Sequence, residues 1–172
     1  MDEAPSPNVE PFPYALRMLR LSRLIAALWL GSAVFLMVAA SAAFGAAPDA
    51  SVAADVVGAM LARWHYLALL APLALLAIEW RRARLLVTGL LFVGILFAAT
   101  EAMVDIRIRG IRAHVGVPIS MLPRESPTRR NFGMLHGVSS MLLLLQAFVA
   151  AGVVIAIEPA IDPITEPTIE KL

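Results

Sequence analysis

Residues 24–44 read LIAALWLGSAVFLMVAASAAF, a continuous run of apolar and small side chains that contains no charge. Three similar stretches follow along the chain, namely Met60–Ile78, Leu85–Val104 and Phe132–Ile157. Because a bilayer core of about 30 Å needs roughly 20 helical residues, each stretch is close to the length of one membrane span. The pattern predicts an all-α integral membrane protein that folds as a four-helix up-down bundle.

The composition agrees with a membrane protein. Apolar residues make up 60% of the 172 residues and the mean hydropathy is +0.80, whereas soluble domains are usually about 45–50% apolar. The net charge of +1 gives no reason to expect nucleic acid as a partner, and the lack of cysteine excludes disulfides and thiolate metal sites. The expected partners are the lipid bilayer and a second copy or a larger membrane complex, since four spans are few for a self-contained transporter.

Proline-rich segments flank the predicted membrane domain, which covers residues 14–157. Residues 1–13 are expected to be disordered up to Pro13, which suits the first turn of a helix. Residues 158–172 combine acidic side chains with proline at every fourth position, and proline cannot continue a helix. An exposed acidic tail is therefore expected at this end.

The arginines indicate how the chain is oriented. Arg17, Arg20 and Arg23 precede the first span, and the first helix usually dominates the positive-inside rule. Both termini are therefore expected on the cytoplasmic side, in a multi-pass protein of a bacterial inner membrane.

The connection between the third and fourth spans is the longest. Apolar side chains recur at helical spacing through residues 104–115, so the third helix is predicted to continue as an amphipathic segment along the membrane interface. Ser126 followed by Pro127 predicts an N-cap and the first turn of the fourth helix.

Three of the spans carry an ionisable side chain into the bilayer. His65 lies in the second span, Glu101 in the third and His136 in the fourth. Asp105 follows Glu101 by four residues and shares its helix face. An up-down topology and a rise of about 1.5 Å per residue put these groups at similar depths below one membrane face. Since such groups are expensive in lipid, we predict that they meet in one polar pocket, with Arg63 or a histidine as the charge partner of Glu101.

One stripe of the fourth helix combines small and polar residues at helical spacing: Gly133, His136, Gly137 and Ser140. Two glycines four residues apart let membrane helices approach closely. We therefore expect this stripe to pack against another helix and to point His136 toward protein.

Two short elements resemble the transmembrane-protein-205-like domain, a family of four-helix membrane proteins. They are Arg63-Trp-His65-Tyr in the second span and Phe132-Gly-Met-Leu-His136-Gly-Val-Ser139 in the fourth. The resemblance covers roughly residues 20–157 and leaves the proline-rich ends outside. It implies an intramembrane histidine at His136 and, by position, at His65, but it implies no activity and no mechanism.

Three functions remain open for the predicted pocket. The favoured interpretation is a non-catalytic accessory, assembly or structural protein, in which the histidines and Glu101 satisfy each other or pair with an arginine. Alternatively, two imidazoles and the carboxylates bind a divalent cation such as zinc, nickel or copper, or move protons. A third hypothesis is a haem held by His65 and His136. The sequence contains no arrangement typical of a hydrolase and no phosphate-binding loop, so an enzyme is not expected.

Overall fold

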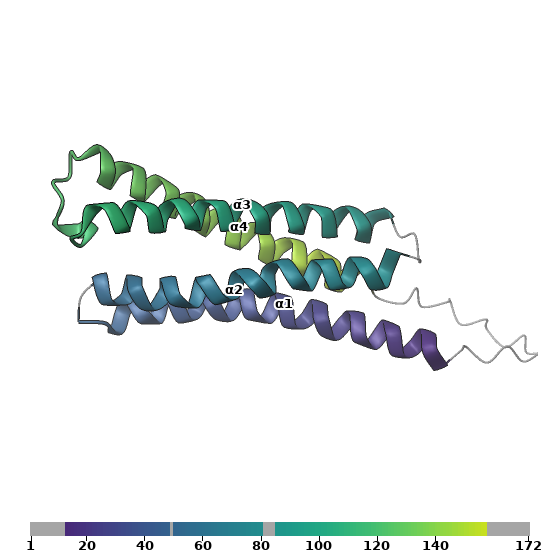
Figure 1. The fold of residues 1–172 in the computed structure, drawn as a ribbon. Coiled ribbons are helices and arrows are strands. Elements are labelled where there is room, and N and C mark those ends of the chain that lie inside the picture. Colours follow the sequence, from purple (N-terminus) through teal and green to yellow (C-terminus); the bar gives the residue numbers. More distant parts are fainter. Residues whose placement is uncertain (1–12, 49, 81–84, 158–172) are drawn as a thin grey trace, which may run out of the picture.

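The computed structural model describes residues 13–48, 50–80 and 85–157. Within these residues the chain forms four long α-helices and one short 3-10 helix: α1 Pro13–Ala46, α2 Ala50–Glu79, α3 Leu85–Val115, η2 Ile119–Met121 and α4 Pro127–Ala156. Successive long helices run in opposite directions (Figure 1), and each of the four is long and apolar enough to cross a membrane. The predicted all-α class and the order of the helices are therefore confirmed. The predictions for the proline-rich ends fall on residues 1–12 and 158–172, which lie outside the described residues.

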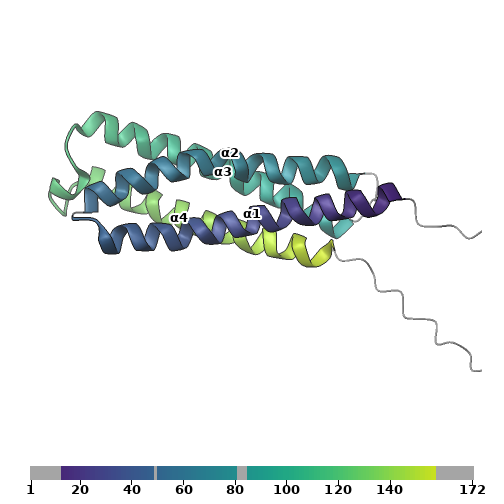
Figure 2. The ribbon, with the colours of Figure 1, turned by 90° about the horizontal axis from the view of Figure 1, so that it is seen from below.

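The four helices form a ring. α1 packs against α2 and α4, and α3 packs against the same two helices. The view from below shows α1 beside α4 and α2 beside α3 (Figure 2). The end of the bundle that carries residues 116–126 is here called the loop end, and the end where α1 begins and α4 finishes is called the terminal end.

The fourth helix crosses the bundle at an angle and moves away from α1 and α2 toward the loop end (Figure 1). The burial of the α4 side chains decreases toward the loop end, where the helix moves away from α1 and α2. From Leu142 to Val153 the helix has many buried side chains, whereas Ser139 is the one buried residue in its described N-terminal part. The loop end of α4 is therefore packed loosely within the chain.

Two apolar clusters fill the interior. The cluster at the terminal end contains Trp29, Leu75 and Leu91, and each of these side chains is fully buried. Trp29 packs so closely on α3 that a Cβ added at Gly94 lies 2.6 Å from its Cη2 atom. The second cluster lies nearer the loop end and includes Trp64, whose Nε1 donates a hydrogen bond to Ser32 Oγ. Both tryptophans thus serve packing inside the bundle.

The connection from α3 to α4 has several of the features that its sequence predicts. α3 continues without a break to Val115, as predicted, and this part runs in line with the rest of the helix (Figure 1). The expected amphipathic pattern holds only in part, because Ile108 and Ile111 are half-buried but Ile106 is exposed and Asp105 is buried. Gly116 has a φ of +66°, a conformation that glycine adopts without steric cost at the end of a helix. Pro127 opens α4 as predicted, but the N-cap residue Ser126 makes no side-chain capping hydrogen bond.

Candidate functional site

The candidate site lies between α2, α3 and α4, on the loop-end side of the terminal apolar cluster. Glu101 is fully buried and Asp105 is 8% exposed, one helical turn further along α3. The side chain of His65 reaches them from α2 and is 10% exposed. The structure thus brings together three of the four residues that were predicted to share one polar pocket.

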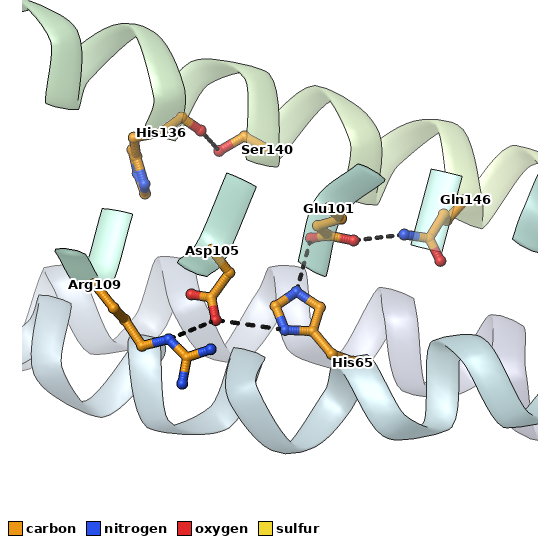
Figure 3. A network of polar contacts seen from close by, with 7 residues as sticks. All are labelled: His65, Glu101, Asp105, Arg109, His136, Ser140 and Gln146. Atoms are coloured by element: carbon orange, nitrogen blue, oxygen red, sulfur yellow. Dashed lines mark hydrogen bonds and ion pairs between the residues drawn. The ribbon is translucent and has the colours of Figure 1, made fainter. Parts of the chain in front are cut away.

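The imidazole of His65 stands between the two carboxylates (Figure 3). Its Nε2 atom lies 3.7 Å from Glu101 Oε1, and its Nδ1 atom lies 3.8 Å from Asp105 Oδ2. Both separations exceed ordinary hydrogen-bond distances, so they are ion-pair contacts that strengthen when the ring carries a positive charge.

Two further side chains extend this arrangement. Gln146 of α4 is fully buried, and its Nε2 donates a hydrogen bond to Glu101 Oε2. At the other end, Arg109 Nε lies 3.0 Å from Asp105 Oδ2, and the Arg109 side chain is 61% exposed. The five residues Gln146, Glu101, His65, Asp105 and Arg109 form a line that we call the polar chain (Figure 3). It runs from a buried amide to an exposed guanidinium.

Several buried atoms of the polar chain have unused hydrogen-bonding capacity. Among the described residues, no hydrogen bond reaches His65 Nε2, Glu101 Oε1 or Gln146 Oε1. Buried polar atoms usually find a partner, because leaving one unsatisfied costs about 1–3 kcal/mol. The polar chain is therefore able to accept at least one more proton or hydrogen-bond donor.

His136 lies outside the polar chain, contrary to the prediction. Its side chain is exposed, and its ring stacks on Phe132 with centroids 6.3 Å apart and an interplanar angle of 6°. The carbonyl oxygen of His136 accepts a hydrogen bond from Ser140 Oγ. In Figure 3 no dashed line joins the imidazole of His136 to Glu101 or Asp105.

The prediction that Gly133 and Gly137 pack against another helix of this chain is also wrong. Gly133 and Gly137 are exposed, and a Cβ added at either position meets no atom within 4 Å. The reason is the rotation of α4. Its buried face is centred on Ser139 and Gln146, seven residues apart. At about 100° per residue, Gly133 and Gly137 lie roughly 130° and 170° around the helix from that face.

Arg63 is not the partner of Glu101. Its Nη1 donates to the carbonyl oxygen of Ala59 on its own helix, and the side chain is exposed. Arg63 precedes His65 by two residues, which places it about 160° away around α2. Its guanidinium therefore points away from the site.

Gln146 is a residue of the site that was not predicted from the sequence. The signal is a single amide inside the apolar stretch 142–150, at the same helical face as Ser139. Polar side chains in spans commonly hydrogen-bond across helices, so an amide in this position is itself a marker of the inward face.

A second buried polar pair lies at the terminal end. Ser22 Oγ donates a hydrogen bond of 2.6 Å to Glu79 Oε1, and both residues are at most 1% exposed. The apolar cluster around Trp29 and Leu75 belongs to the same end of the bundle. This cluster separates the Ser22–Glu79 pair from the polar chain.

The geometry limits which ligands the polar chain can hold. Among the described residues, no group of three or more His, Asp and Glu side chains is arranged to hold a metal ion. The physical reason is that the two carboxylates face opposite nitrogens of one ring and so do not converge on a common point. A haem between His65 and His136 is likewise not supported, because the His65 ring is directed at α3 and His136 is exposed.

Comparison of the chain with protein-family models, curated proteins and solved structures found no match. The resemblance to the transmembrane-protein-205-like family therefore stays a prediction.

Proposed function

We propose that this chain is a non-catalytic multi-pass membrane protein and that its polar chain is a proton-accepting site open to one membrane face. The observation that carries the proposal is the position of His65 between two carboxylates. A neutral imidazole has one N–H, so one of its nitrogens faces a carboxylate with a lone pair. One additional proton, on the ring or on Glu101, turns that repulsive contact into an attractive one.

The charges support the same conclusion. Asp105 is neutralised by Arg109, whereas the contacts of Glu101 within the described part of the chain are the neutral amide of Gln146 and the imidazole of His65. An unneutralised carboxylate costs about 2.5–3.5 kcal/mol near the centre of a span. A single proton shared between Glu101 and His65 removes that cost, because the polar chain then has no net charge.

Access to this proton comes from one end. Arg109 connects the polar chain to the exposed part of α3 at the loop end. Toward the terminal end, Trp29, Leu75 and Leu91 are fully buried apolar side chains, and such a layer offers a proton no carrier groups. The proposal is therefore a one-sided proton site. With both termini on the cytoplasmic side, it opens to the opposite face.

Glu101→Gln tests the proposal, with exposed Glu125→Gln as the matched control. The chain has 3 histidines, so ¹⁵N-histidine labelling gives a short NMR spectrum of the protein in lipid nanodiscs. At neutral pH the unaltered protein should show either an imidazolium signature for His65 or an infrared band of a protonated carboxyl group. Whichever of the two signals the unaltered protein shows, Glu101→Gln should lose it and Glu125→Gln should keep it.

A different result contradicts the proton site. If the unaltered protein has a neutral His65 and no protonated carboxyl group at neutral pH, the polar chain holds no extra proton. The contacts then serve only to tie α2, α3 and α4 together, as the structural interpretation requires.

A further inference from the structure

A cleft of about 710 Å³ lies between the last turns of α3 and the first turns of α4, apart from the polar chain. Its polar lining comes from Arg107 and His114 of α3 and from Thr128 and Asn131 of α4, and its apolar wall includes Ile111 and Leu135. The cleft thus has a cationic and hydrogen-bonding side and an apolar side, at the loop end of the bundle.

A second groove continues from the cleft along α4. It has a volume of about 430 Å³ and is lined by Gly137, Val138 and Met141 among others. Met134 lines both the cleft and the groove, so the two spaces share a boundary. Gly137 keeps the groove open, because a Cβ added there meets no atom within 4 Å. The combined site passes from a polar mouth to a wholly apolar groove.

The arginine at the mouth of the cleft, Arg107, has no charge partner among the described residues. Arg109 pairs with Asp105, and Arg112 pairs with Asp55 at 3.2 Å. By contrast, no ion pair or side-chain hydrogen bond with another described residue involves Arg107, which is exposed at the edge of the cleft. No carboxylate lines the cleft. An anion placed there therefore meets an available guanidinium and no opposing charge.

We propose that the cleft and groove together bind an anionic phospholipid, with its phosphate against Arg107 and one acyl chain along Gly137. Guanidinium and phosphate form strong charge-assisted hydrogen bonds. The polar mouth lies next to the loop end and the apolar groove lies further along the helix. This arrangement matches a phospholipid, whose headgroup lies at the membrane surface and whose acyl chains point inward. This site also gives the exposed glycine at 137 a role: it makes room for lipid. The proposal is independent of the proton site, since neither Arg107 nor Gly137 belongs to the polar chain.

Lipid retention by the purified full-length protein in detergent tests the proposal. Native mass spectrometry measures the binding of phosphatidylglycerol, with phosphatidylcholine as the zwitterionic comparison. We expect one phosphatidylglycerol to bind with clear preference. Arg107→Gln should weaken that binding by about tenfold, the size expected for one charge-assisted contact. Gly137→Leu should weaken it by filling the groove.

Two matched controls separate the site from general effects. Arg124→Gln removes an exposed arginine that lies in the loop between α3 and α4 and does not line the cleft. Gly133→Leu enlarges an exposed glycine that lines neither the cleft nor the groove. Both variants should bind phosphatidylglycerol as the unaltered protein does. An equal loss with Arg124→Gln overturns the proposal in favour of general charge attraction, and unchanged binding by Arg107→Gln also overturns it.

A titration with inorganic phosphate distinguishes a lipid site from a site for a free anion. If the lipid is the ligand, inorganic phosphate should fail to displace phosphatidylglycerol. The acyl-chain part of the proposal is wrong if inorganic phosphate binds as tightly as phosphatidylglycerol and Gly137→Leu leaves the binding of phosphatidylglycerol unchanged.

Discussion

His65 is the centre of the polar chain because each of its ring nitrogens faces a carboxylate of α3. Removing the ring leaves Glu101 and Asp105 on one helix face, one turn apart, and among the described residues Arg109 is then their one cationic partner. Isolated buried charges are strongly destabilising, whereas changes at exposed side chains usually have small effects. The consequence of a substitution here thus depends on whether the side chain faces the carboxylates.

We accordingly expect His65→Ala to lower the free energy of unfolding by about 3 kcal/mol or more. His136→Ala should change it by less than about 0.5 kcal/mol, because that ring is exposed. The glycine stripe in the sequence predicts the opposite order. Reversible unfolding of both variants in the same detergent measures the difference, and a larger effect at His136 would show that this ring has a buried role.

At the scale of a helix, α3 carries glycines in two different environments. A Cβ at Gly94 collides with the indole of Trp29, which is fully buried, while a Cβ at Gly89 meets no atom within 4 Å. Gly94 therefore makes room for the Trp29 indole, which reaches α3 from α1 across the bundle.

Gly94→Ala should destabilise the protein by about 1–3 kcal/mol, since the added Cβ lies too close to the fully buried indole and one of the two must shift. Gly89→Ala is the matched control on the same helix. It should be neutral or stabilise by up to about 1 kcal/mol, because alanine is the better helix former. Thermal unfolding in detergent provides the measurement. Equal effects at the two positions would exclude a specific contact between α1 and α3.

At the scale of the whole molecule, the up-down order places the start of α1 and the end of α4 at one end of the bundle and residues 116–126 at the other. The proposed orientation puts the termini in the cytoplasm, so that the polar chain and the lipid cleft open to the opposite face. The chain lacks cysteine, and single cysteines therefore report sidedness without background.

In intact cells, a membrane-impermeant maleimide should label Glu125→Cys from outside, and Asp2→Cys only after permeabilisation. Leu36→Cys is the control for a buried position, since Leu36 is 3% exposed, and it should stay unlabelled in both conditions. Labelling of Asp2→Cys alone from outside would invert the orientation and place the proton site on the cytoplasmic side.

The sequence alone determined the number, order and direction of the helices. The length of an apolar run is a local property, and a run of roughly 20 residues leaves few alternatives to a membrane-spanning helix. The meeting of His65 with Glu101 and Asp105 was also predictable, since helical rise and alternating direction set the depth of each residue. Pro127 and Gly116 mark helix ends for reasons that likewise lie within a few residues.

Only the tertiary structure decided which face of each helix turns inward. In an apolar span nearly every side chain is compatible with lipid and with the core, so the sequence pattern leaves the rotation of α4 undetermined. Packing of Leu143, Ala147 and Ala150 against the other helices set that rotation, and it brought Gln146 to Glu101 while leaving His136 exposed and outside the polar chain. Depth follows from counting residues along one helix, whereas rotation follows from the sum of contacts among all four.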